Sequence, residues 1–258
     1  MNAVLAAVAD LGGQGLAAGF VVFLRIGAAM ALLPAFGEHS VPTRVRLVLA
    51  LAFTAVVTPA VLADVAPLAG AGDGLATALA TETLSGFAIG IALRLFVMAL
   101  EMAGTMAAQS TSLAQLFGAG GEPMPSMSHL LVAAGLALAV MAGLHVRIAE
   151  VLILSYEVLP AGRFPDPALM LDWGVGNIAR AFALAFSLAA PFVIASLIYN
   201  VALGVINRAM PQLMVAFVGA PALTAGSLML LAIAAPLGLA IWADALELYL
   251  GDPFGAAR

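Results

Sequence analysis

Ionisable side chains inside apolar stretches are the residues of this chain most suited to chemistry or to buried pairing. They are Glu82, Arg94, Glu101, Arg147, Glu150 and Arg180. A charge in an apolar segment is costly unless it is paired, so such residues mark a transport pathway or a protein interface. In a stand-alone proton or solute transporter, Arg94 and Glu101 would form the relay. In a subunit of an assembly they would pair at interfaces, which the small residues beside Arg94 favour. Arg147 and Glu150 are close enough to pair with each other.

A Gly-x-Gly-Asp string at Gly70 to Asp73 offers a different chemistry. Intramembrane aspartyl proteases carry this string, and two of their carboxylates share a proton and activate water. Here the string lies in a Gly-rich connector, and no second Asp lies within an apolar segment to complete a dyad. A turn is the favoured interpretation, and a protease with Asp73 as its nucleophile-activating group is the weaker alternative.

Other catalytic and cofactor chemistries find no support in the residue pattern. His39, His129 and His145 are dispersed and have no neighbouring ligands, so no metal site is expected. The chain has no Cys and no nucleotide-binding, zinc-protease or nucleophile-elbow motif. We therefore expect a protein that is not an enzyme and that needs no cofactor.

The composition is that of a membrane protein. Hydrophobic residues make up 64% of the 258 residues and charged residues only 9%, against about 25% charged in soluble domains. The net charge of −5 gives no basic patch, so a nucleic-acid partner is not expected.

Apolar periodicity predicts about six hydrophobic segments in one all-α, polytopic membrane domain spanning residues 1–258. The segments cover residues 15–36, 45–63, 75–117, 127–159, 167–208 and 212–249. Prolines are expected to shape them, because proline lacks an amide hydrogen. Pro59 and Pro160 would end helices, Pro191 would kink one, and Pro221 and Pro236 would interrupt the last segment.

Three of these segments are too long for one crossing of a bilayer. At 1.5 Å per residue, the segment 75–117 would be about 65 Å long, roughly twice the hydrocarbon thickness. Such segments must bend back into hairpins, tilt strongly, or leave the bilayer and be shielded by other protein. Tyr156 and Trp173, near a helix junction, are expected at the level of the membrane interface.

Two helix faces carry small and polar residues at helical spacing and are expected to pack against protein. One holds Glu82, Gly86, Gly90, Arg94 and Glu101. The other holds Ser196, Asn200, Gly204 and Asn207, where an amide facing lipid would leave its donors and acceptors unpaired. Arg208 and Pro211 are expected to end that second helix.

The segment from Asn207 to Gln212, followed by Gly219-Ala-Pro221, resembles the Asn-Arg-x-x-Pro-Gln segment of the FliR/SctT family of type III export-gate proteins. Further pieces are similar and follow the family's order: Arg25 with Pro34, Val41-Pro-Thr-Arg-Val45, and His145 followed by Leu159-Pro160 and Gly162. Departures include Gly143-Leu144 for the usual Asn-Gly and Glu122-Pro123 for Asp-Pro.

The resemblance implies a subunit of the flagellar protein export gate in the bacterial inner membrane, at the flagellar basal body. It would form, with FliP and FliQ, the channel for unfolded flagellar proteins and would work with FlhB. The family's pore-closing plug would fall at about residues 109–122, namely Gln109, Ser112, Gln115, Leu116, Phe117 and Glu122. The residues expected to pack between subunits are Gly86, Gly90, Arg94, Glu101, Ser196, Asn200, Gly204, Asn207, Arg208, Pro211 and Gln212.

Overall fold

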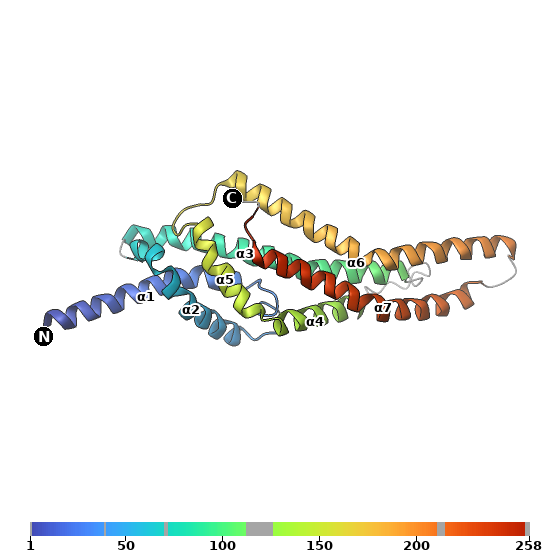
Figure 1. Ribbon diagram of the computed structural model, residues 1–258, viewed down its shortest axis with the longest axis horizontal. Coiled ribbons are helices and arrows are strands. Elements are labelled where there is room, and N and C mark those ends of the chain that lie inside the picture. Colours follow the sequence, from blue (N-terminus) through green and yellow to red (C-terminus); the bar gives the residue numbers. More distant parts are fainter. Residues whose placement is uncertain (1, 39, 70–71, 112–125, 211–214, 256–258) are drawn as a thin grey trace. The chain divides into compact units, whose positions relative to one another are not determined.

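The computed structural model of the chain describes residues 2–38, 40–69, 72–111, 126–210 and 215–255, and these residues form helices and connectors without strands. The helices are α1 (Asn2–Met30), α2 (Thr43–Ala69), α3 (Gly72–Thr111), α4 (Ser126–Met141), α5 (Leu144–Val158), α6 (Pro167–Ala209) and α7 (Val215–Gly251), as labelled in Figure 1. The all-α fold class expected from the sequence is confirmed.

The helices contribute to two compact units. Unit 1 comprises Met1–Leu95, Val140–Ile178 and Leu248–Arg258, and unit 2 comprises Phe96–Ala139 and Ala179–Glu247. Helices α3, α4, α6 and α7 each supply residues to both units, α4 only its last two to unit 1. That the whole chain forms a single domain stays a prediction.

Unit 1 is built around α1. Helix α1 packs against α2, and α2 against α5 (Figure 1). Val21, Val22, Ile26 and Ala29 of α1 are fully buried, and burial of their side chains is the main favourable term for this unit. On α2, by contrast, Leu47, Val48, Leu51 and Val56 are exposed.

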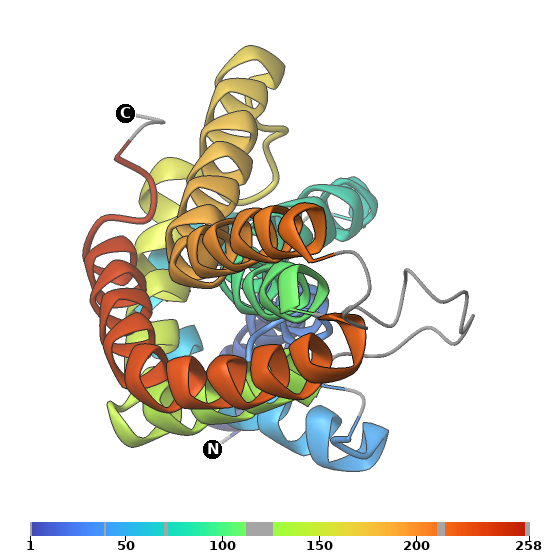
Figure 2. The same cartoon turned by 90° about the vertical axis from the view of Figure 1, so that its right-hand side faces the viewer.

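Unit 2 is organised around the second part of α3. Trp242 of α7 is fully buried and donates its Nε1–H to the Phe96 carbonyl of α3 at 2.8 Å. A methyl group on Gly104 of α3 would collide with the backbone of Ser128 in α4. Ser196 of α6 donates a hydrogen bond to the carbonyl of Ser110 in α3. Figure 2 shows this part of α3, in green, between α6 on one side and α4 and α7 on the other.

In the part of the chain that the structure describes, four helical stretches are long and apolar enough to cross a membrane. They are Thr43–Leu68, Ala76–Ser110, Pro167–Ala209 and Ala225–Gly251. The broken pair α4 and α5 would count as a fifth, and the apolar helix Gly15–Met30 is shorter. With 43 residues, α6 is about 65 Å long at 1.5 Å per residue. The prediction of a polytopic membrane protein with overlong segments is thus confirmed.

Proline positions predicted some helix ends and not others. α5 ends at Val158, shortly before Pro160 as expected, and Pro191 lies inside α6 as the sequence indicated. Pro59, by contrast, lies inside α2, and α7 continues through Pro221 and Pro236. The expected end at Pro59 and the interruptions of the last segment are therefore wrong. A proline removes one backbone hydrogen bond, but neighbouring groups in an apolar protein environment can compensate, so a long helix persists.

A glycine breaks the segment that the sequence predicted as one helix from 127 to 159. Gly143 has φ of 85°, in the left-handed region, and separates α4 from α5. A glycine adopts this conformation without the penalty that a Cβ brings. The break was missed because isolated glycines are common within membrane helices.

Candidate functional site

A buried ion pair between α1 and α3 is the most concentrated polar feature of unit 1. Arg25 Nε and Glu82 Oε2 are 2.8 Å apart, and both side chains are fully buried. The guanidinium also donates from Nη1 to Ser155 Oγ at 2.9 Å and from Nη2 to the Leu159 carbonyl at 2.8 Å. It lies 3.7 Å from the centre of the Tyr156 ring, in cation–π geometry. We call Arg25, Glu82, Ser155 and Tyr156 the Arg25 cluster.

The second carboxylate oxygen of Glu82 binds the connector that follows α5. Glu82 Oε1 accepts a hydrogen bond from the Gly162 amide at 3.1 Å and lies 3.5 Å from Thr81 Oγ1. Both charges therefore meet an opposite charge and additional polar groups. Burial of an ion pair is tolerated only with such full pairing, because each charge loses its hydration.

Small residues on α3 bring Glu82 within reach of Arg25. A Cβ on Gly86 would collide with the Arg25 carbonyl oxygen and lie 2.9 Å from the Ala28 Cβ. A Cβ on Gly90 would lie 2.9 Å from the Ala29 carbonyl oxygen. Gly86 is one helical turn from Glu82, so both residues lie on the same face of α3. This face approaches α1 closely and also provides the carboxylate of the ion pair.

The sequence had marked Glu82 as an ionisable residue in an apolar segment, but not its pairing with Arg25. The two residues are separated by 57 positions, and no local spacing rule connects them. Tyr156 and Trp173 are buried within unit 1, and their place at the level of the membrane interface stays a prediction.

Arg94 pairs with the connector between α1 and α2. Its Nη1 lies 2.5 Å from Glu38 Oε1, and both side chains are about one-fifth exposed. Arg46 Nη2 donates to the carbonyls of Glu38 and Val41 at 3.0 and 3.4 Å. Two arginines thus hold this connector in unit 1, and the role of Arg94 between subunits stays a prediction.

The remaining ionisable residues of the apolar segments have more open surroundings. Arg147 Nη1 and Glu150 Oε2 are 3.1 Å apart on the surface of α5, so the pairing predicted from their spacing is confirmed. Glu101, in unit 2, is half-buried, and its backbone carbonyl accepts a hydrogen bond from Ser128 Oγ.

The polar stripe of α6 runs from the interior to the surface of unit 2. Ser196 is buried against α3, and Asn200 Nδ2 donates to Ser196 Oγ at 3.1 Å. Gly204, Asn207 and Arg208 are exposed. α6 ends at Ala209, directly after Arg208 as predicted. The inter-subunit role of the stripe stays a prediction.

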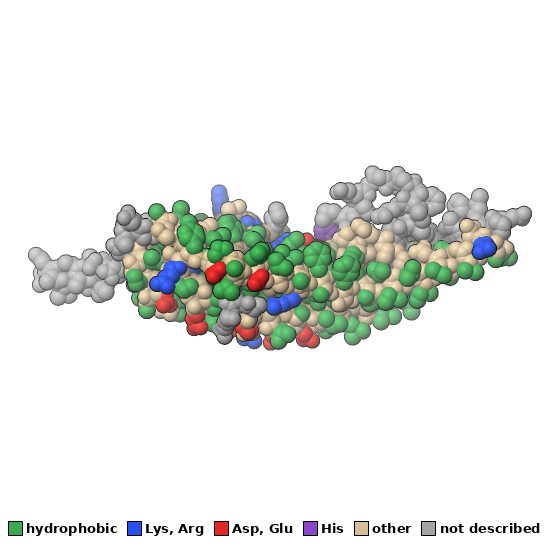
Figure 3. Space-filling model, turned by 90° about the horizontal axis from the view of Figure 1, so that it is seen from above, with side chains coloured by type: hydrophobic (Ala, Val, Ile, Leu, Met, Phe, Trp, Pro, Cys, Tyr) green, Lys and Arg blue, Asp and Glu red, His purple; other side chains and the backbone are tan. Residues whose placement is uncertain are grey.

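The same part of α6 exposes many apolar side chains. They are Phe182, Phe186, Val193, Ile194, Leu197, Ile198, Val201, Val205 and Ile206. Figure 3 shows hydrophobic side chains gathered along this helix. Exposed apolar surface of this extent is expected to contact lipid or another protein.

Most of the predicted plug lies outside the described residues. This holds for Ser112, Gln115, Leu116, Phe117 and Glu122, and also for Pro211 and Gln212 of the motif after α6. Gln109 lies near the end of α3 and is exposed. α3 begins at Gly72, so the backbone of Asp73 belongs to the first turn of this helix rather than to a loop.

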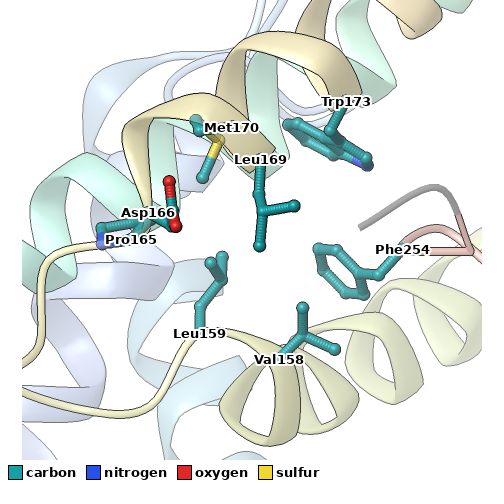
Figure 4. Close-up of a pocket in the computed structure, with 8 residues that line it drawn as sticks. All are labelled: Val158, Leu159, Pro165, Asp166, Leu169, Met170, Trp173 and Phe254. Carbon is teal, nitrogen blue, oxygen red and sulfur yellow. The ribbon is translucent and has the colours of Figure 1, made fainter. Parts of the chain in front are cut away.

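A small apolar cavity lies where α5, α6 and the end of the chain meet in unit 1. It measures about 50 Å³ and is lined by Val158, Leu159, Pro165, Asp166, Leu169, Met170, Trp173 and Phe254. Figure 4 shows the Trp173 and Phe254 rings at one side of it, and the two rings are stacked with centroids 6.0 Å apart. Trp173 Nε1 donates to the Pro253 carbonyl at 2.9 Å, which fastens the chain end to α6.

Comparison with known proteins assigns the family. The family model described as bacterial export proteins, family 1, matches residues 16–249, nearly the whole chain. The chain belongs to this family. Flagellar biosynthetic protein FliR of Caulobacter vibrioides is 32% identical over 229 residues, which cover 87% of this chain and 90% of that protein. The FliR proteins of Aquifex aeolicus and Escherichia coli are 30% and 28% identical, covering 83% and 84% of this chain and 84% of each relative.

These relatives confirm the resemblance to FliR that the sequence motifs indicated. They establish a flagellar export protein with several apolar helices long enough to span a membrane. Within this FliR family member, the Arg25–Glu82 and Arg94–Glu38 pairs are internal ion pairs of unit 1.

Proposed function

We propose that this FliR family member is a non-enzymatic subunit of the flagellar type III protein export gate in the bacterial inner membrane. With FliP and FliQ it forms the channel through which unfolded flagellar proteins pass, and it works with FlhB. The family match over residues 16–249 is the observation that carries the proposal.

The exposed surface of unit 2 supports a role within an assembly. α6 exposes many apolar side chains, and near its C-terminal end it also exposes Asn200, Asn207 and Arg208. Amides and a guanidinium facing hydrocarbon would each lose hydrogen bonds at a cost of several kcal/mol. Contact with partner subunits, and not with lipid alone, would satisfy these groups.

The first test is isolation of the tagged chain from membranes that also contain FliP, FliQ and FlhB. We expect FliP and FliQ to co-purify and the mass of the particle to exceed that of a 26.0 kDa monomer several-fold. Cells without FliP should accumulate much less of the chain, because its exposed apolar faces would lack their partner. A chain that is stable and monomeric without partners, and that moves a proton or solute alone, would instead indicate a transporter.

A second test concerns the proposed plug at residues 109–122. We propose that this segment closes the channel at rest, with Phe117 as the main occluding side chain. Deletion of residues 115–121 should therefore raise the ion conductance of membranes that contain the assembled gate, while the subunits still co-purify. Unchanged conductance of a normally assembled gate would argue against the plug.

A further inference from the structure

The connector between α5 and α6, residues 159–166, is held at two backbone positions by the two members of one buried ion pair. Arg25 Nη2 binds the Leu159 carbonyl and Glu82 Oε1 binds the Gly162 amide. We propose that the Arg25–Glu82 pair is a clamp that fixes this connector, and so the start of α6, in addition to joining α1 to α3. This inference concerns unit 1 alone and does not rest on the export function.

The geometry of the ion pair leaves Arg25 Nη2 and Glu82 Oε1 available to bind the connector. An arginine–carboxylate pair often uses both carboxylate oxygens. Here Arg25 binds Glu82 through Nε and Oε2. The other oxygen is thus available as an acceptor for an N–H, and Nη2 as a donor for a carbonyl. The connector presents those two complementary groups, three residues apart.

The connector itself lies at the surface. Pro160, Arg163 and Phe164 are exposed. A turn bond from the Arg163 amide to the Pro160 carbonyl measures 3.3 Å, and Gly162 adopts a left-handed φ of 70°. A short exposed segment with one long backbone bond is expected to open easily. Hydrogen bonds to charged groups are about twice as strong as neutral ones, so the two bonds of the clamp restrain the connector more strongly than its own turn bond.

The restraint passes on to α6. Asp166 ends the connector, and its Oδ1 accepts a hydrogen bond from the Ala168 amide at 2.8 Å, which caps the first turn of α6. Leu159, Pro165 and Asp166 also line the cavity beside Trp173 and Phe254. Fixing Leu159 and Gly162 therefore fixes both the cap and the wall of the cavity.

The test is hydrogen exchange of the full chain, purified from membranes in detergent with any proteins that remain bound to it, for the double variant Arg25→Met/Glu82→Met. Removing both charges leaves no uncompensated buried charge, and apolar replacement of a buried pair is often tolerated. We expect the variant to accumulate and the peptides of α1 and α3 to keep their protection. The connector amides should exchange at least tenfold faster than in the unmodified chain.

Two variants control for indirect effects. Glu150→Met removes the exposed Arg147–Glu150 pair on α5, and Ser155→Ala removes one acceptor of Arg25 but neither bond to the connector. Both should leave connector exchange unchanged within about twofold. The proposal is overturned if the connector amides of the double variant exchange at the original rate, or if protection falls as much in α1 and α3 as in the connector. It is also overturned if the double variant fails to accumulate while both control variants accumulate normally.

Discussion

Replacing Arg25 alone by Met is expected to remove most of the folded chain from membranes. The change leaves the Glu82 carboxylate fully buried without its cation, and breaking a buried pair on one side costs about 3–5 kcal/mol. Native proteins are stable by only about 5–15 kcal/mol, so a large share of the stability is lost. Immunoblots of membranes for the tagged chain, and swimming of cells that depend on it, would measure the effect.

Arg147→Met is the matched control for this prediction. Arg147 also pairs with a glutamate, but the two side chains are 42% and 57% exposed. Exposed pairs contribute about 0–1 kcal/mol, so accumulation and swimming should stay near normal. Equal losses for Arg25→Met and Arg147→Met would contradict the assignment of a special role to the buried pair.

Replacing Gly86 by Ala is expected to have a comparably large effect. The added Cβ would meet the Arg25 carbonyl oxygen and the Ala28 Cβ, so α1 and α3 would have to separate. Forcing extra atoms into a packed interior costs about 1–3 kcal/mol, and separation would also stretch the ion pair between Arg25 and Glu82. We expect reduced accumulation and a lower thermal transition of the purified chain in detergent.

Gly176→Ala tests the same substitution in open surroundings. Gly176 lies inside α6, and a Cβ there meets nothing within 4 Å. Alanine favours helix over glycine by about 1 kcal/mol, so this variant should be as stable as the original chain or slightly more stable. If Gly86→Ala accumulates and unfolds like Gly176→Ala, that result would contradict the close packing of α1 against α3 at Gly86.

Local patterns predicted the parts of this structure that depend on neighbouring residues. Apolar length gave the membrane class and the overlong helices, and a separation of three positions gave the Arg147–Glu150 pair. Of the polar stripe on α6, Ser196 is buried as its spacing indicated, whereas Asn200, Gly204 and Asn207 are exposed and their packing against partners stays a prediction. These features depend on apolar length or helical spacing, which are local properties of the sequence.

The remaining features depend on residues far apart in the chain or on tertiary surroundings. Arg25 meets Glu82, and Arg94 meets Glu38, across more than fifty positions each. Pro59 remains inside α2 although local rules end a helix there. Gly143 breaks a helix while Gly176 does not, although an added Cβ would meet nothing within 4 Å at either position, so residue type alone does not predict which glycine leaves helical geometry.

The Arg25 cluster also bears on how the chain is made. The ribosome adds Glu82 and Ser155 57 and 130 positions after Arg25, and at about 5–20 residues per second the second interval lasts roughly 6–26 s. Pro253 and Phe254, which pack on Trp173, come later still. Arg25 therefore has no counter-ion until the 57 residues up to Glu82 have been added, and the contacts of unit 1 that involve Ser155 and Phe254 can form only later.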